Sequence, residues 1–249
     1  GLYCSGVPAV MTADGPAGLR INADRGVKTT AWPVATLLAC TWDPELLYRV
    51  GQAAALEVKE NNFGMWLTPA INIHRSPLCG RNFEYYSEDP LVSGKLAAAM
   101  VRGIQSQNIS ACVKHFCCNN KETNRKKSDS RVSERALREI YLKGFEIVVK
   151  ESEVWAVMTA YNLLNGTYTS ESKDLLTGIL RQEWGFDGLV MTDWDNLAEQ
   201  YREILAGNDL RMPNGNPKRL QAVLAEGLIT RQDLEVSATR VLEYLLRME

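Results

Sequence analysis

The stretch Gly188-Leu-Val-Met-Thr-Asp193 places a short apolar run directly before a carboxylate. The same arrangement recurs in Ser110-Ala-Cys-Val-Lys-His115 and in Val154-Trp-Ala-Val-Met-Thr-Ala-Tyr161, which also end in polar side chains. Apolar runs of this length are typical of strands that are buried on both faces of a parallel sheet. Longer amphipathic stretches separate the runs, so we expect strands and helices to alternate along the chain.

The rest of the chain follows this alternation. Strands are expected at residues 7–14, 65–71, 110–115, 154–161 and 188–193, with a weaker one at 209–212. Helices are expected at residues 44–59, 91–107, 133–150, 173–183, 218–226 and 231–247. Asp89-Pro90 is expected to begin the second helix, and Ser133 is expected to cap the third.

A barrel is favoured over an open doubly wound sheet. No Gly-rich phosphate loop follows the first strand, as an open nucleotide-binding sheet would require. Nearly every strand instead ends in a polar cluster, which is where a barrel holds its active site. Because about six strands are recognisable against eight in an ideal barrel, we predict a TIM-like (β/α)8 barrel that is irregular or lacks its first helix. No linker or repeat interrupts it, so a single domain is expected over residues 1–249.

The composition excludes several classes of protein. A formal net charge of -2 argues against a binder of the nucleic acid backbone. No apolar run approaches the roughly 18–20 residues that span a bilayer, and the first residues lack the features of a signal peptide. The six cysteines are Cys4, Cys40, Cys79, Cys112, Cys117 and Cys118. Their spacing matches no zinc pattern, so we expect no metal site. We also expect reduced, mostly buried thiols, which slightly favour the cytoplasm, and no organic cofactor.

Asp193 and Trp194 are the first candidate site residues. A carboxylate at a strand end points into the mouth of a barrel. An aromatic ring beside it suits a sugar, which combines an apolar ring face with hydroxyl groups. Alternatively, Asp193 caps the next helix, because Asp-X-X-Asn spacing resembles an N-cap region.

Further polar residues stand at the other strand ends and in the loops after them. Lys114 and His115 can hold hydroxyl groups or stabilise a carboxylate. Alternatively, Lys114 pairs with a helix carboxylate and His115 fills a polar core position. Arg81 is the candidate in the loop that precedes Pro90, and Asp14 is a candidate because it ends the first strand. The loop at residues 119–125 offers the groups that vicinal diols need, although a solvated loop has the same composition.

Taken together, these segments resemble the barrel domain of family 3 glycoside hydrolases, most closely the β-glucosidase branch. The motifs that carry the resemblance follow the family's order over nearly the whole chain: Asp14-Gly-Pro-Ala-Gly-Leu-Arg20, Gly80-Arg-Asn-Phe-Glu-Tyr-Tyr-Ser-Glu-Asp-Pro90, Lys114-His-Phe116 with Asn119-Asn120, Val157-Met-Thr-Ala-Tyr-Asn162, Gly185-Phe-Asp-Gly-Leu-Val-Met-Thr-Asp-Trp194 and Ala206-Gly-Asn-Asp-Leu-Arg-Met-Pro213.

The resemblance implies a retaining, two-step hydrolysis of terminal β-D-glycosides, with Asp193 as the nucleophile and Trp194 as the aromatic beside it. It implies that six residues line the subsite for the non-reducing-end sugar: Asp14, Arg81, Lys114, His115, Met158 and Tyr161. Arg81, Lys114 and the Tyr161 hydroxyl are expected to favour the anionic form of Asp193. The expected substrates are small oligosaccharides or aryl and alkyl β-glycosides, with β-glucosides ahead of β-xylosides.

The chain departs from the family in its general acid. A retaining glycosidase needs a second carboxyl group about 5–5.5 Å from the first. In the β-glucosidase branch it is usually a Glu on an α/β sandwich domain, which we do not expect among these residues, and we also expect the family's leading helix to be missing. The His-Asp pair of the N-acetylglucosaminidase branch is absent from Lys114-His-Phe-Cys-Cys-Asn-Asn120. Glu84, Glu122 and Asp195 are the local substitutes.

Two interpretations without catalysis stay open. The chain is a sugar-binding module or subunit that has kept the pocket, or it is a structural fragment that folds only against a partner domain.

Overall fold

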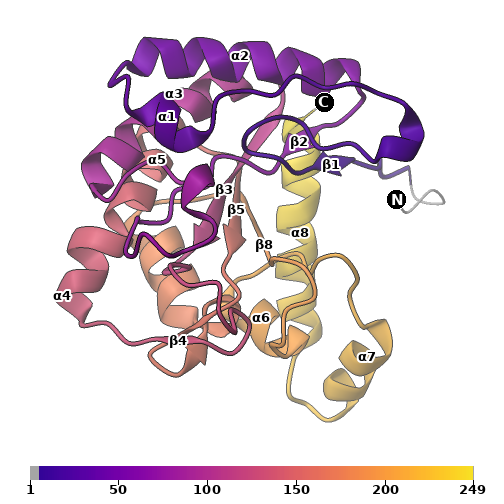
Figure 1. Ribbon diagram of the computed structural model, residues 1–249. Coiled ribbons are helices and arrows are strands. Elements are labelled where there is room, and N and C mark those ends of the chain that lie inside the picture. The colour runs from indigo at the N-terminus through magenta and orange to yellow at the C-terminus, as the bar shows by residue number, and fades with distance from the viewer. Residues whose placement is uncertain (1–5, 249) are drawn as a thin grey trace.

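The central sheet has five parallel strands in the order β1-β2-β3-β5-β8. Figure 1 shows the computed structural model, which describes residues 6–248. The strands are β1 (Thr12–Ala13), β2 (Met65–Trp66), β3 (Ser110–Phe116), β5 (Ala156–Thr159) and β8 (Leu189–Met191). The predicted α/β architecture with a parallel sheet is confirmed, whereas closure of this sheet into a barrel stays a prediction.

The five main strands lie where the sequence predicts them, but several are shorter. β3 is buried at all seven of its residues, as expected for a strand covered on both faces. β2 pairs with β3 over only two residues: beyond Trp66 the Thr68 N–H donates to the Trp66 carbonyl, and Pro69 has no N–H to donate to the ladder. A single bridge from Ala70 to Lys114 then resumes the pairing. The weak strand expected at 209–212 is reduced to one bridge between Leu210 and Met191, at the free edge of β8.

Helices pack around the sheet. The α-helices are α1 (Ala35–Ala39), α2 (Pro44–Glu60), α3 (Pro90–Gln105), α4 (Glu134–Ala136), α5 (Lys143–Ser152), α6 (Gln200–Ala206), α7 (Pro217–Ala225) and α8 (Arg231–Arg247). Two segments have π-helical hydrogen bonding, η4 (Leu137–Tyr141) and η6 (Asp174–Glu183). Three 3₁₀ turns are η2 (Ala23–Arg25), η3 (Asn82–Glu84) and η5 (Thr169–Glu171). All six predicted helices are present, the third divided into α4, η4 and α5, whereas the short helices α1 and α6 were not predicted.

Local chemistry explains where the long helices begin. The Asp89 side chain accepts hydrogen bonds from the first backbone N–H groups of α3, and Pro90 occupies the first position of that helix. Asp43 and Pro44 begin α2 in the same way. The two helices lie side by side in Figure 1. They can approach closely because Gly103 of α3 has no Cβ atom. A Cβ atom at this position would overlap a backbone carbonyl of α2.

A second, smaller sheet joins the loops beyond the main strands. Its strands are β4 (Asp129–Ser130), β6 (Leu163–Leu164) and β7 (Thr167–Tyr168). β4 follows the loop after β3, and the β6–β7 hairpin follows β5. This sheet therefore ties together two of the loops that surround the carboxyl ends of the main strands.

The five cysteines within residues 6–248 are free thiols, and Cys4 lies outside the described residues. Four of them are buried, in agreement with the predicted burial: Cys79, Cys112, Cys117 and Cys118. Burial raises the pKa of the Cys112 thiol to about 12. Among the helices of the same part of the chain, none combines the length and the apolar character that crossing a bilayer demands.

Candidate active site

A cavity of about 520 Å³ opens where the parallel strands end. Its lining includes all eight residues that the sequence analysis singled out: Asp14, Arg81, Lys114, His115, Met158, Tyr161, Asp193 and Trp194. Most of them end a strand or directly follow one, and parallel strands bring their carboxyl ends to the same edge of a sheet. The cavity has seven further lining residues: Thr12, Arg20, Leu67, Phe83, Glu84, Glu122 and Arg125.

The wall after β1 carries an ion-paired carboxylate. The Lys114 ammonium donates to Asp14 Oδ1 at 2.6 Å, and Arg20 Nη1 lies 3.3 Å from Asp14 Oδ2. Burial alone would raise the pKa of Asp14, but the Lys114 charge and hydrogen bond outweigh it and lower that pKa. The alternative in which Lys114 pairs with a helix carboxylate is wrong, because its partner stands at a strand end.

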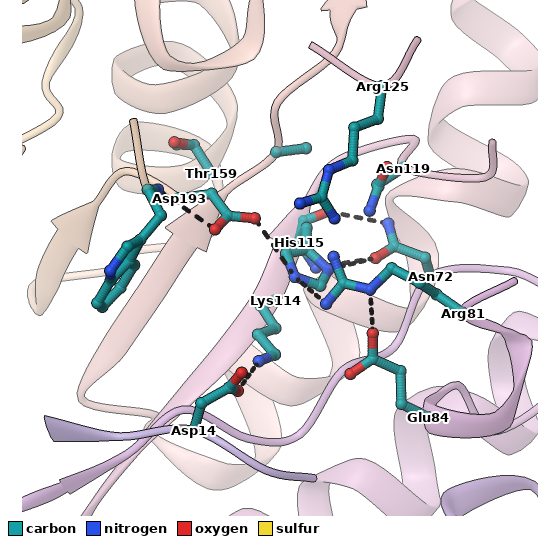
Figure 2. Close-up of polar contacts among 12 residues, drawn as sticks. Asp14, Asn72, Arg81, Glu84, Lys114, His115, Asn119, Arg125, Thr159 and Asp193 are labelled. Carbon is teal, nitrogen blue, oxygen red and sulfur yellow. Dashed lines mark hydrogen bonds and ion pairs between the residues drawn. The ribbon is translucent and has the colours of Figure 1, made fainter. Parts of the chain in front are cut away.

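His115 is held from both sides of its ring (Figure 2). Arg81 Nη2 donates to His115 Nε2 at 2.9 Å, while Nδ1 lies 3.3 Å from Asn72 Oδ1. Asn72 also exchanges hydrogen bonds of 2.9 Å with the His115 backbone N–H and carbonyl. Burial, together with the charges of Arg81, Lys114 and Arg125, lowers the pKa of His115 well below its usual range. The ring is therefore neutral, and the hydrogen bonds assign its proton to Nδ1.

Asp193 follows β8, the outermost strand on the other side of the sheet from β1. It is largely buried, with 12% of its side chain exposed. Its Oδ2 atom is 3.7 Å from His115 Nε2, so the contact joins a carboxylate to a neutral ring. Burial raises the pKa of Asp193 above its usual value, and this outweighs the lowering by Lys114, Arg81 and the Tyr161 hydroxyl. The expectation that these groups favour the anion was right about each of them, but it left out the larger effect of burial.

The helix-cap alternative for Asp193 is also wrong. The next helix, α6, begins at Gln200 with Glu199 at its N-cap, six residues beyond Asp193. The Asp193 Oδ1 atom accepts a local hydrogen bond from the Trp194 backbone N–H, at 3.3 Å. The carboxylate therefore faces the cavity without a capping role.

Tyr161 connects two walls of the cavity. The guanidinium of Arg125 lies 4.7 Å from the centre of its ring and the ammonium of Lys126 lies 5.0 Å from it. Burial, and then the neighbouring Asp193 charge, raise the pKa of the Tyr161 hydroxyl. Lys126 also donates to the Asp195 backbone carbonyl at 2.7 Å, so the loop after β3 touches the loop after β8.

Three other carboxylates line this cavity among the described residues, and each is ion-paired. Asp14 pairs with Lys114, Glu84 pairs with Arg81, and Glu122 Oε2 is 3.0 Å from Arg125 Nη1. Asp195 is not part of the lining. Within residues 6–248, no group of three or more His, Cys, Asp or Glu side chains is arranged to hold a metal ion.

Several residues that form the site were not predicted from the sequence. Asn72 orients His115, and Arg20 and Arg125 line the cavity. Asn72 stands in the polar cluster that ends the second predicted strand. Its position after an apolar run could therefore have identified it from the sequence. Arg125 lies in the loop rich in hydrogen-bonding groups, but composition does not separate a wall of the cavity from a solvated loop.

The model of the glycosyl hydrolase family 3 N terminal domain matches residues 3–244, which confirms the resemblance carried by the motifs. Beta-glucosidase A of Butyrivibrio fibrisolvens is 62% identical over 230 residues, which cover 92% of this chain and 28% of that protein. An exo-alpha-(1->6)-L-arabinopyranosidase of Bifidobacterium longum is 40% identical over 98% of this chain and 33% of its own length.

The structural comparison agrees. The structure of beta-glucosidase 3B from Thermotoga neapolitana in complex with glucose superposes with a TM-score of 0.95 at 49% sequence identity. The match covers 99% of this chain and 36% of that one. The chain thus spans about a third of the length of the relatives it matches.

Proposed function

The chain belongs to glycosyl hydrolase family 3, and from that premise we propose that it forms the sugar-binding, nucleophile-bearing part of a β-glucosidase-type hydrolase. The observation that carries the proposal is the meeting of seven polar, aromatic and apolar residues, from strand ends and one loop, around the buried carboxylate of Asp193. We also propose that residues 1–249 form one domain whose sheet is an irregular (β/α)8 barrel, continued beyond β8 by the Leu210 bridge.

The proposed reaction has two displacements at the anomeric carbon. Asp193 attacks this carbon and forms a glycosyl ester, while the bond to the leaving oxygen breaks and that oxygen takes a proton from a general acid. Water then attacks the same carbon, gives its proton to the conjugate base, and releases Asp193 as a carboxylate. Two inversions retain the configuration of the sugar.

The other lining residues have roles that follow from their chemistry. The Asp14 carboxylate accepts hydrogen bonds from sugar hydroxyls, and Lys114 donates them. Arg81 holds the neutral ring of His115, which lies next to Asp193. Met158 and Trp194 offer apolar surface to the face of the sugar ring.

We propose that the general acid lies outside these residues. An acid must carry a proton, whereas the three other carboxylates in the cavity lining form ion pairs with Lys114, Arg81 and Arg125. The resemblance to the β-glucosidase branch points to a Glu on an α/β sandwich domain. The relatives are about three times as long as this chain, which leaves room for such a domain.

A slow substrate tests the nucleophile. A 2-deoxy-2-fluoro β-glucoside with an activated leaving group reacts slowly, because fluorine destabilises the oxocarbenium-like transition states. Its good leaving group needs little protonation, so the first step proceeds and a covalent adduct accumulates. Peptide mass spectrometry is expected to locate the sugar on Asp193. A label on another residue, or no label on the folded protein, would contradict the assignment.

The Asp193→Ala variant separates an enzyme from a sugar-binding module. A catalytic role predicts that the variant binds glucose and turns over no glycoside. In a sugar-binding module, which turns over no glycoside to begin with, the substitution changes only the affinity for glucose. Aryl β-glucosides are expected to be hydrolysed ahead of β-xylosides. An aryl α-L-arabinopyranoside belongs in the same panel, because one relative carries that activity in its name.

A further inference from the structure

The loop that carries Asp193 is anchored on both sides to the segment at residues 210–212. The Thr192 backbone N–H donates to the Leu210 carbonyl at 2.9 Å, and the Asp195 N–H donates to the Met212 carbonyl at 3.1 Å. The Met212 N–H in turn donates to the Thr192 hydroxyl at 2.9 Å. Asp193 and its aromatic neighbour are thus the two residues between these anchors, and their placement depends on where residues 210–212 lie.

Arg211, in the middle of that segment, holds the second half of the loop. Its Nη1 atom donates to the Ala198 carbonyl at 2.8 Å and its Nη2 atom to the Asn196 carbonyl at 3.1 Å. A planar guanidinium fixes both carbonyls in one geometry. Arg211 is absent from the lining of the Asp193 cavity, so it acts on the loop and not on the sugar.

Glu203 on α6 binds this guanidinium and the loop together. Its carboxylate is buried, with 1% of the side chain exposed, and accepts from Arg211 Nη1 at 3.0 Å and Asn196 Nδ2 at 2.7 Å. A third hydrogen bond comes from the Ser170 hydroxyl at 3.1 Å. Burial raises the pKa of Glu203, opposed by the Arg211 charge and by these hydrogen bonds. A buried carboxylate is costly unless it is paired in this way, and two of its three donors come from the loop and its anchor.

We propose that Glu203 is a positioning residue for Asp193, holding the nucleophile's loop in place through Arg211 and Asn196. The inference rests on the proposed function of Asp193. A catalytic group that moves by about 1 Å loses on the order of 10²-fold in rate, even where the change lies far from the chemistry. Loosening the loop is therefore expected to slow attack on the anomeric carbon while leaving the remaining sugar contacts in place.

The Glu203→Gln variant of the full-length protein tests this role. Glutamine keeps one acceptor oxygen but loses the charge that faces Arg211. The control is Arg240→Met, which removes an arginine on α8 whose Nη1 is 3.2 Å from the buried Asp209 carboxylate. Both variants break an ion pair to a buried carboxylate, but Arg240 neither lines the cavity nor contacts the Asp193 loop.

The readout is inactivation by the 2-deoxy-2-fluoro β-glucoside, which separates the rate of attack from sugar affinity. In Glu203→Gln the inactivation rate constant is expected to fall about 10- to 100-fold, with the inhibition constant within about 3-fold of the natural protein. In Arg240→Met both constants are expected to stay within about 2-fold, although melting temperatures fall in both variants. If the role of Glu203 were merely structural, Glu203→Gln would lower the melting temperature and leave both constants unchanged.

A second variant covers the case in which Glu203→Gln does not fold. Asn196→Ala removes one of the three hydrogen bonds to Glu203, together with the bond of 3.2 Å that Asn196 Oδ1 accepts from the Ala198 N–H. It is expected to slow inactivation in the same direction by about 3- to 10-fold. Unchanged rate constants in a folded Glu203→Gln variant, or in Asn196→Ala, overturn the positioning role while label on Asp193 upholds the proposed function. A natural protein that takes no label on Asp193 overturns both.

Discussion

Two aspartates face the same cavity from opposite ends of the sheet, and the protein shifts their pKa values in opposite directions. Asp14, after β1, lies in direct contact with the Lys114 ammonium, and its pKa is lowered. Asp193, after β8, is in contact with the neutral ring of His115, and its pKa is raised. The same cation acts on both carboxylates, but it is hydrogen-bonded to only one of them.

The difference supports the distinct roles that we propose for two identical side chains in one cavity. A carboxylate bonded to an ammonium is fixed in place and has its charge neutralised, which suits the binding of hydroxyl groups. A desolvated carboxylate without its own cation keeps its electron pairs available for attack. The contrast between Asp14 and Asp193 therefore predicts distinct consequences when either one is changed.

The largest effect is expected from Asp193→Asn. Loss of the proposed nucleophile should lower kcat by roughly 10⁴-fold or more. The affinity for glucose, measured by calorimetry, should change by less than about tenfold, because the remaining contacts are uniform binding. A variant that keeps more than a few per cent of the natural kcat would place the nucleophile elsewhere and remove the contrast.

Asp14→Asn is expected to act on binding and stability. The substitution leaves Lys114, which is 2% exposed, without its charged partner. We expect KM to rise roughly 10- to 100-fold. The free energy of unfolding should fall by only about 2 kcal/mol, because the Asp14 carboxylate is itself partly exposed. Steady-state kinetics and urea unfolding measure the two. The double variant with Lys114→Met should recover stability but not affinity, and recovery of both would contradict a binding role.

The two pKa shifts have opposite effects on stability as the pH changes. The lowered pKa of Asp14 stabilises the fold above the ordinary aspartate pKa, and this is lost as the pH falls through the lowered value. The raised pKa of Asp193 favours its protonated form, so the fold loses stability as the pH rises from the ordinary aspartate pKa through the raised value. Asp193→Asn should therefore melt at a higher temperature than the natural protein at pH 7, by a few degrees, and at the same temperature at pH 3. Equal melting temperatures at both pH values would contradict the raised pKa.

The smallest effect is expected from Lys126→Met, which removes a contact between the loop after β3 and the loop after β8. The Lys126 ammonium contacts the Tyr161 ring and the Asp195 carbonyl at the protein surface. Such contacts contribute about 0.5–1 kcal/mol, so kcat/KM should fall about 2- to 5-fold. The exposed neighbour Lys127 offers a matched control, since Lys127→Met should leave kcat/KM unchanged. An equal loss in both variants would point to a general effect of surface charge.

The parts of the fold that the sequence predicts well are those with local signals. The starts of α2 and α3 follow from Asp43-Pro44 and Asp89-Pro90, because a capping carboxylate and a proline act within one turn. The small sheet of β4, β6 and β7 has strands of two residues, which are too short to show any periodicity. It forms only where the loops after β3 and β5 meet, and no local sequence pattern predicts this contact.

The candidate site divides in the same way. Asp14, Lys114 and Asp193 could be selected from the sequence because each stands at the end of an apolar run, and parallel strands end at one edge. Arg125 joins them from a loop nine residues beyond the end of β3, and Glu203 reaches the Asp193 loop from a helix that was not predicted. Loop paths depend on contacts between distant segments, so residue type alone does not place these side chains.

The sequence by itself determined the alternation of strands and helices, the family, and the strand-end residues that line the cavity. Those features depend on local patterning and on motifs in a fixed order. Only the tertiary structure decided that Lys114 bonds to Asp14 and not to Asp193, and that His115 is neutral. The reason is physical: a pKa depends on burial and on the charges within a few ångströms, and these are set by the packing of segments that lie far apart along the chain.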